Sequence, residues 1–399
     1  MHRIFFFIWV LIAPFWVRCS AQQVSAETES FQLISNELYV SGAQNTDAYL
    51  PLLQGKKIGV VANQTSVIGR KHLVDSLLTH GIDIVKIFTP EHGFRGAADA
   101  GAAVNHGKDE ATGLPIVSLY GKNKKPSSEM LRGIDLILFD LQDVGVRFYT
   151  YISTLTYVME AAAENQLPAI VLDRPNPNGF YVDGPVLQPG NKSFIGLHQV
   201  PVVYGMTIGE YAKMVNGEGW LNNSLLCDLT VIPINNYNRN AIYELPVKPS
   251  PNLPTWESIY LYPTLCFFEG TIVSVGRGTD TPFQVFGHPD MRGGTCFIPQ
   301  SKDGASKPLL EGQRCRGENK TDFAHDFANN TNQIHLQWII DSYQQLKDKK
   351  FFTNYFRLLS GNDTLQQQIE AGLDENQIRA SWQKELDAFQ KIRQKYLMY

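Results

Sequence analysis

Residues 57–65 read KIGVVANQT, a mostly apolar run that ends in three polar side chains. Four later segments repeat this arrangement: IVKIF at 84–88 before TPEHG, IVSL at 116–119 before YG, LILF at 136–139 before DLQD, and AIVL at 169–172 before DRPN. Runs of Val, Ile and Leu with little alternation are typical of strands that are buried on both faces. The sequence therefore predicts five such strands, each followed directly by a polar cluster.

Helical spacing of apolar residues separates these strands, for example at Lys71–His80 and Ser153–Gln166. Strands that alternate with helices predict an α/β fold with a doubly wound parallel sheet. In such sheets ligands bind outside the carboxyl ends of the strands, so the five polar clusters are expected to meet in one crevice.

The pattern changes near residue 250, where KPSPNLPT at 248–255 is too rich in proline for a helix or a central strand. We predict a catalytic domain at 22–254 and a second, smaller α/β domain at 255–399. Within the second domain we expect a strand at Thr271–Val275 and a long polar loop at 300–332. Three helices are expected after that loop: His335–Lys349, Thr364–Ala371 and Asn376–Leu397, the last with a docking face of Ile378, Trp382, Leu386 and Phe389.

The first residues are typical of a secretory signal peptide. The apolar run Ile4–Val17 is shorter than the roughly 20 residues of a membrane span, and the small residues Ser20 and Ala21 offer a cleavage point. We expect residues 1–21 to be removed and the protein to be secreted, with the periplasm as its destination. Lipid anchoring through Cys19 is the alternative.

The charge of the mature chain argues against nucleic acid as a partner. Without Arg3 and Arg18 the chain keeps 33 of its 35 basic residues against 39 acidic ones, a formal net charge of −6. Binding of nucleic acid calls for a basic surface instead. Since no second long apolar run follows, we expect no membrane span in the mature chain.

The cysteines and histidines give no pattern of a metal site. No C-x-x-C pair is present, and His106, His198 and His288 lack the spacing of metal ligands. Oxidising surroundings would allow a Cys296–Cys315 disulfide, and unpaired cysteines are an equal alternative. GRGT at 276–279 resembles a phosphate loop only faintly, because no lysine follows. We expect neither a metal nor a cofactor.

Glu91 is the leading candidate for a catalytic acid. It follows Pro90 at the end of a predicted strand, and Phe94 could desolvate its carboxyl group and raise its pKa. His92 and Arg95 could orient the carboxyl group and contact the substrate. The competing interpretation is a helix cap or an ion pair with Arg95.

Asp140, Gln142 and Asp143 form the second cluster. Cleavage of glycosidic bonds commonly uses two carboxyl groups, and Asp140 or Asp143 could supply the second. Either could equally hold Arg147 or cap the next helix. Gln142 and Arg147 are candidate substrate contacts.

Further side chains near the strand ends could bind a sugar. Asn63, Asp173, Arg174 and Asn176 could bond to hydroxyl, acetamido or carboxylate groups, although Arg174 could instead form a structural ion pair. Tyr149 could stack on a pyranose ring or belong to the core, and Arg277, on a turn between glycines, suits a substrate carboxylate.

Taken together, these segments resemble the exo-β-N-acetylmuramidases of the NamZ type. The resemblance rests on GVVANQT at 59–65, FTPEHGFRG at 88–96, DLQDVGVRFYTY at 140–151, DRPNP at 173–177, PSPNL at 249–253, and EGT at 269–271 with GRGT at 276–279. The order is kept from about residue 50 to the C-terminus. Pro299–Asn332 matches no family motif.

The resemblance implies a Rossmann-like domain, a smaller C-terminal domain and an active site in the cleft between them. The family releases N-acetylmuramic acid from the non-reducing ends of peptidoglycan fragments of the MurNAc-GlcNAc type, with a catalytic glutamate that matches Glu91 and without a nucleotide. Arg95, Arg147, Arg174 and Arg277 are candidate partners for the lactyl carboxylate of the sugar.

Two other functions remain open at this stage. A non-catalytic binding protein for muropeptides or acidic sugars could use the same cleft. An esterase is disfavoured because the sequence lacks a G-x-S-x-G motif. For hydrolysis, the second group could also be the acetamido group of the substrate.

Overall fold

The fold is described from a computed structural model. It describes residues 33–34, 39–90, 93–95, 107–326, 330 and 332–399. All of these residues belong to one compact unit, Phe31–Tyr399. The predicted signal peptide and Cys19 lie outside the described residues.

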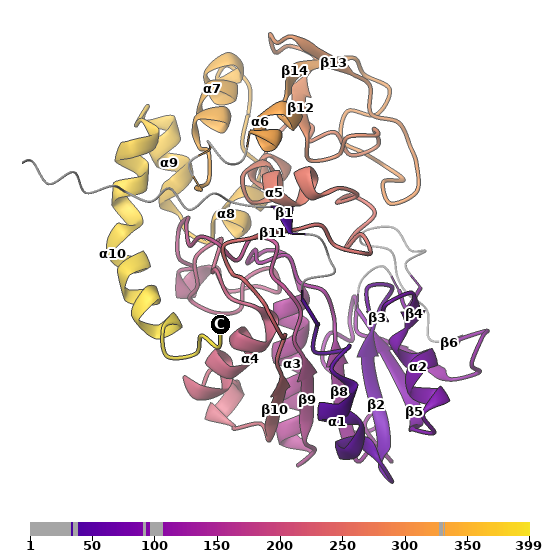
Figure 1. The fold of residues 1–399 in the computed structure, drawn as a ribbon. Helices are drawn as coiled ribbons and strands as arrows, with labels where there is room; N and C mark the ends of the chain where they lie inside the picture. The colour runs from indigo at the N-terminus through magenta and orange to yellow at the C-terminus, as the bar shows by residue number, and fades with distance from the viewer. Residues whose placement is uncertain (1–32, 35–38, 91–92, 96–106, 327–329, 331) are drawn as a thin grey trace, which may run out of the picture. The chain divides into compact units, whose positions relative to one another are not determined.

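A seven-stranded sheet forms the N-terminal part of this unit (Figure 1). Its strands lie in the order β10-β9-β8-β2-β5-β7-β6, and all neighbours are parallel except β6 and β7. The strands span Lys57–Ala62 (β2), Asp83–Thr89 (β5), Gly107–Lys108 (β6), Pro115–Ser118 (β7), Leu136–Asp140 (β8), Ala169–Leu172 (β9) and Leu229–Ile232 (β10).

The predicted α/β fold is confirmed, because the five apolar runs form five adjacent strands of this sheet. β2 lies at its centre, where Val61 pairs with Phe88 of β5 on one side and with Phe139 of β8 on the other. Parallel strands of one sheet end at the same edge, so the polar clusters after β2, β5, β7, β8 and β9 all follow that edge.

Helices cover both faces of the sheet, as a doubly wound fold requires. Helices α1 (Thr46–Leu53) and α2 (Leu73–Thr79) pack with Leu136 and Leu138 of β8 in one buried cluster. Helices α3 (Tyr151–Glu164) and α4 (Ile208–Gly217) pack with Ile137 and Phe139 in the other. Successive residues of β8 thus enter opposite cores, which explains why its sequence shows no polar alternation.

The C-terminal part combines helices with a small antiparallel sheet in the order β12-β14-β13. Thr271–Val275 is not a strand: only Thr271 and Ser274 make isolated bridges there, so that prediction is wrong. The elements are α5 (Trp256–Leu265), η3 (Cys266–Gly270), β12 (Val285–His288), β13 (Thr295–Phe297), β14 (Cys315–Asn319), α6 (Thr321–His325), α7 (Gln337–Leu346), α8 (Asn354–Ser360), α9 (Thr364–Glu370) and α10 (Glu375–Arg393).

The three predicted C-terminal helices correspond to α7, α9 and α10. In α10 the four residues of the predicted docking face are all buried, and Asp374 caps the helix by accepting a hydrogen bond from the Gln377 amide at 2.8 Å. This capping box fixes the start of the helix.

Short elements complete the chain. β1 (Leu33–Ile34) pairs with β11 (Ile242–Tyr243), and β3 (Val67–Ile68) pairs with β4 (Lys71–His72). Two turns of 3₁₀-helix lie at Pro189–Asn191 (η1) and Asn222–Ser224 (η2).

The cysteines of the described residues are unpaired. On the antiparallel strands β13 and β14, Cys296 lies opposite Arg316 and Cys315 lies opposite Phe297. Cys296 is exposed whereas Cys315 is buried, so the two thiols project to opposite faces of the sheet. The Cys296–Cys315 disulfide that we considered is therefore wrong for this structure.

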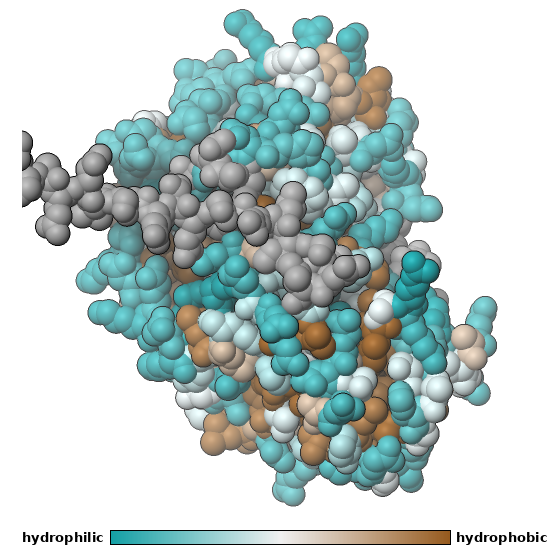
Figure 2. Space-filling view, viewed as in Figure 1, coloured by the Kyte–Doolittle hydropathy of each residue, from teal (hydrophilic) through white to brown (hydrophobic). Residues whose placement is uncertain are grey.

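The face of the molecule seen in Figure 2 is mostly hydrophilic, and apolar side chains gather mainly in its lower half, where Figure 1 shows the seven-stranded sheet. Among the described residues, none of the helices combines the length and the apolar character that a membrane crossing requires.

Candidate active site

A cavity of about 460 Å³ opens next to the carboxyl ends of β7 and β8. Its walls come from both parts of the chain: the loops after β7 and β8, the segments 193–195 and 250–253, helices α5 and α8, and the turn before β12. The lining residues include Tyr120, Lys124, Tyr149, Tyr151, Ser193, Asn252, Tyr262, Cys266, Glu269, Arg277, Phe283 and Tyr355.

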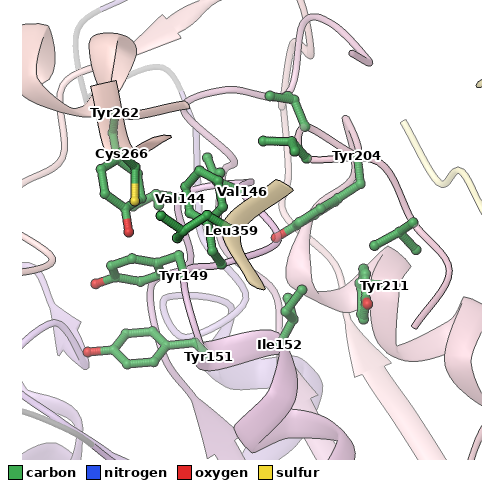
Figure 3. Close-up of a cluster of buried hydrophobic side chains, with 14 of the residues drawn as sticks. Val144, Val146, Tyr149, Tyr151, Ile152, Tyr204, Tyr211, Tyr262, Cys266 and Leu359 are labelled. Carbon is green, nitrogen blue, oxygen red and sulfur yellow. The ribbon is translucent and has the colours of Figure 1, made fainter. Parts of the chain in front are cut away.

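Tyrosine side chains form one wall of this cavity. The rings of Tyr149 and Tyr151 meet edge to face with their centroids 4.8 Å apart, and Figure 3 shows their hydroxyl groups projecting to the same side. Tyr149 donates a hydrogen bond to the Pro249 carbonyl at 2.9 Å, and Tyr151 accepts one from the Asn63 amide at 2.7 Å. Burial raises the pKa of Tyr149 well above its ordinary value, so its hydroxyl group stays protonated. An uncharged aromatic wall with polar edges suits a sugar ring.

An ion pair forms a second, charged wall. Arg277 Nε donates to Glu269 Oε1 at 2.5 Å, and Cys266 Sγ lies 3.5 Å from Glu269 Oε2. The side chains of Arg277 and Glu269 keep 27% and 21% of their surface exposed, and both line the cavity. Of the predicted site residues, Tyr149 and Arg277 line the cavity.

Asp140 does not line the cavity. It is fully buried at the end of β8 and receives two hydrogen bonds from Arg174, Nε to Oδ1 at 2.6 Å and Nη2 to Oδ2 at 2.8 Å. Arg174 therefore forms a structural ion pair, which was the alternative to a role in substrate binding. Both groups position the strand ends and leave little surface for a ligand.

Asp143 is also buried and does not line the cavity. It accepts hydrogen bonds from the Tyr204 hydroxyl and from the Gly145 amide at 2.7 Å. Burial raises the pKa of Asp143 to about 6 and outweighs these two bonds, which act in the opposite direction. Gly145 has a positive φ of 76°, and a Cβ there would lie 2.1 Å from Asn176 Oδ1, so this turn requires glycine.

The position of Arg147 disagrees with a role in substrate binding. Its guanidinium is fully buried and donates to four backbone carbonyls, those of Pro185, Val200, Leu359 and Ser360, at 2.7 to 2.9 Å. Because these carbonyls belong to three separate segments, Arg147 joins the loop after β8 to helix α8.

The remaining polar residues at the strand ends hold loops together. Gln142 donates to the Asp143 and Pro175 carbonyls, and Asn176 donates to the Met206 carbonyl at 2.8 Å. Asn63 accepts from the Thr65 amide at 2.9 Å as well as donating to Tyr151. All three are buried, and in this structure their contacts are made with protein groups.

Asp173 lies at the end of β9 and is fully buried. It accepts hydrogen bonds from the Thr207 and Tyr399 hydroxyls, each at 2.7 Å, and from the Gly209 amide at 2.8 Å. Burial raises the pKa of Asp173 to about 7. The contact with Tyr399 ties the last residue of the chain to the sheet.

Glu91 and His92 lie outside the described residues. The strand that precedes them, β5, ends at Thr89, which pairs with Ser118 at the end of β7. Arg95, shortly after them, pairs with Asp109 through two hydrogen bonds of 2.8 Å and lies over the Phe94 ring. Arg95 is thus paired with Asp109 and, at 3.5 Å, with Asp75, and neither aspartate lines the cavity.

Sequence reasoning missed the cavity residues Glu269, Tyr262 and Lys124. Glu269 belongs to one of the segments that carry the family resemblance, yet its position in the turn η3 gives no periodic pattern that would reveal which way it faces. Lys124 lies in an exposed loop, where a lysine is expected in any soluble protein.

Within the part of the chain that the structure describes, no three His, Cys, Asp or Glu side chains are grouped closely enough to hold a metal ion.

Two comparisons with known proteins, one with family models and one with a curated relative, name the same family. Residues 58–257 match the model of the N-terminal part of exo-β-N-acetylmuramidase NamZ, and residues 260–399 match the model of its C-terminal part. The peptidoglycan β-N-acetylmuramidase NamZ of Bacillus subtilis (strain 168) is 41% identical over 373 residues, which cover 88% of this chain and 89% of the relative.

Two crystal structures of DUF1343 family proteins from Bacteroides fragilis NCTC 9343 share the fold. One is 44% identical with a TM-score of 0.83 and covers 90% of this chain and 99% of its own. The other is 28% identical with a TM-score of 0.77 and covers 91% and 99%. From the fold, the motifs and these matches together, the chain belongs to the NamZ family of exo-β-N-acetylmuramidases.

Proposed function

We propose that this protein is an exo-acting glycosidase that releases N-acetylmuramic acid from the non-reducing ends of peptidoglycan fragments. The support is that its relative from Bacillus subtilis, 41% identical, is named a peptidoglycan β-N-acetylmuramidase, and that the two matching family models are named exo-β-N-acetylmuramidase. The observation that carries the proposal is the cavity at the carboxyl ends of β7 and β8, with a tyrosine wall and an ion-paired wall. Its volume of about 460 Å³ lies in the range of small-molecule sites.

Glu91 is the proposed general acid. It comes two residues after Thr89, the last residue of β5, and β5 lies beside β7 in the sheet. Proton transfer to the glycosidic oxygen would let the leaving sugar depart as a neutral alcohol.

The second participant is proposed to be the acetamido group of the substrate. Asp140 and Asp143 are both buried and bonded to protein groups, and neither lines the described cavity. Neither carboxylate therefore has a surface from which to attack a sugar or activate water there. Participation of the substrate acetamido group is a known exception to the two-carboxyl mechanism. Asp140 and Asp143 are then positioning residues.

Incubation with a MurNAc–GlcNAc disaccharide, followed by mass spectrometry of the products, tests this function. A glycosidase converts the disaccharide into free N-acetylmuramic acid and N-acetylglucosamine, with many turnovers per protein molecule. A non-catalytic binding protein gives saturable binding and leaves the disaccharide intact, and that result would contradict the proposal.

We propose in addition that residues 1–21 direct export and are removed. The support is the apolar run Ile4–Val17 with small residues after it. Determination of the N-terminus of the exported protein tests this: a start at Gln22 agrees with cleavage after Ala21, whereas a lipid on Cys19 would identify the anchored form.

A further inference from the structure

Arg277 differs from the other arginines that the sequence offered as partners for a substrate carboxylate. In each of the other three, two guanidinium nitrogens donate hydrogen bonds to protein oxygens. The acceptor is a carboxylate for Arg95 and Arg174, and backbone carbonyls for Arg147. Arg147 and Arg174 are also buried. Among the described residues, Arg277 bonds through Nε alone, to Glu269.

The contact with Glu269 leaves one edge of the guanidinium free for a ligand. Nε donates to Glu269. The two terminal nitrogens, Nη1 and Nη2, make no hydrogen bond with a described residue. The guanidinium carbon lies 5.1 Å from the centre of the Phe283 ring, which also lines the cavity. An ion pair on one side and an aromatic ring below hold the planar group in one orientation.

The backbone around Arg277 is fixed as well. Gly278 has a φ of 80°, and a Cβ at this position would lie 2.3 Å from the Gln300 carbonyl oxygen, so no other residue can occupy it without a shift. The Gly278 carbonyl accepts a hydrogen bond from the Gln300 amide at 3.0 Å. Arg277 therefore projects from a rigid turn, and less conformational freedom is lost when it binds a ligand.

The cavity has one other cation among the residues described. Lys124 lies in the loop after β7 with its ammonium group 4.4 Å from the centre of the Phe194 ring. A lysine is a flexible point charge, whereas the arginine fork matches the two oxygens of a carboxylate. Lys124 is therefore the natural comparison for Arg277.

We infer that Arg277, held in place by Glu269, binds the lactyl carboxylate of N-acetylmuramic acid and so selects this sugar over neutral hexosamines. The inference rests on the proposed function, because it assigns a residue to the recognition of that substrate. Arg277 is the specificity residue, and Glu269 acts through it as a positioning residue.

The test compares two aryl β-glycosides of N-acetylmuramic acid, one with a free lactyl carboxylate and one with its methyl ester. A charge-assisted hydrogen bond contributes about 1.5–3 kcal/mol, which corresponds to roughly a ten- to hundredfold preference for the acid in kcat/KM. In Arg277→Gln this preference should fall to within about threefold of unity, through a raised KM for the acid. Arg277→Lys should lie between the two.

Further variants separate positioning from charge. Glu269→Ala should reduce the preference for the acid, whereas Glu269→Gln, which keeps an oxygen for Arg277 Nε, should retain it. Lys124→Gln is the matched control and should keep the preference of the wild type. Hydrolysis of the ester reports in every variant that the protein is folded.

Two results would overturn the inference: an acid preference that survives in Arg277→Gln, or one that is lost in Lys124→Gln instead. Failure of the proposed function has a different signature, because the wild type would then cleave neither glycoside. In that case the affinities for free N-acetylmuramic acid and for its methyl ester, measured by calorimetry, show whether Arg277 recognises the carboxylate. Equal binding of the acid by the wild type and Arg277→Gln would still refute the role of Arg277.

Discussion

Asp143 is a carboxyl group whose ionisation is opposed by its burial. Its pKa in the folded protein is about 6, against an ordinary value of 3.8. Well below pH 3.8 the group is protonated in both the folded and the unfolded chain, so its burial costs no stability there. Between pH 3.8 and about 6 the group ionises in the unfolded chain but stays protonated in the folded one, so the folded state loses stability on the order of 3 kcal/mol over this range and no more above it.

Asp143→Asn removes this titration and keeps an acceptor for the Gly145 amide and the Tyr204 hydroxyl. The free energy of unfolding is measured by urea denaturation at pH 4 and pH 7. The wild type should lose stability between pH 4 and pH 7 relative to the variant, because only the wild type has the buried carboxyl group. If the difference between variant and wild type is the same at both pH values, the carboxyl group is not buried as described.

At the residue scale, the sequence identified polar side chains at the ends of strands but not the direction in which they point. Asp140 and Arg174 belong to different clusters 34 positions apart, and their mutual ion pair depends on how β8 and β9 align in the sheet. Tyr149 and Arg277 reach the cavity through loops whose path no periodic pattern describes.

At the scale of elements, helix α10 packs against the rest of the protein through a stripe of buried apolar side chains, and Arg379 and Arg393 add polar contacts. Trp382 is 2% exposed and packs in the larger buried cluster. Truncation of a buried tryptophan leaves a cavity and typically costs about 3–5 kcal/mol.

Trp382→Ala should therefore lower the free energy of unfolding by about that amount in urea denaturation. Lys384→Ala, two residues further along the exposed face of α10, should change it by less than about 0.5 kcal/mol. Equal effects of the two changes would mean that the stripe does not dock the helix.

Elements with a complete periodic pattern were predictable from the sequence, and others were not. The strands β2 and β9 have the predicted bounds, because buried parallel strands need unbroken apolar runs. Helix α5 contains Pro263 and follows a proline-rich segment, so its sequence does not indicate a helix. Thr271–Val275 is apolar like a strand, yet glycines follow it and it meets its neighbours only at isolated bridges.

At the scale of the whole molecule, Arg147 links the sheet to the C-terminal helices. Its four carbonyl partners belong to segments up to 213 positions away. Arg147→Lys keeps the charge but cannot satisfy four carbonyls with three donors in this geometry. We expect a loss of about 3 kcal/mol or more in the free energy of unfolding, because buried carbonyls are left without donors.

Arg132→Lys, at an exposed position, is the control for the exchange of arginine for lysine. Urea denaturation of both variants measures the effect. A loss below about 1 kcal/mol for Arg147→Lys would show that the segments are held together by apolar packing instead.

In the proposed mechanism the general acid, Glu91, comes from the loop after β5, and the substrate binds in a cavity whose walls come from both parts of the chain. The most direct test of this mechanism is Glu91→Gln. Turnover of the MurNAc–GlcNAc disaccharide should fall by on the order of 10²–10⁴, because glutamine keeps the shape but has no proton to give. The loss should be smaller for a 4-nitrophenyl glycoside, whose leaving group departs without protonation. Unchanged turnover of the disaccharide by a folded Glu91→Gln protein would contradict the account.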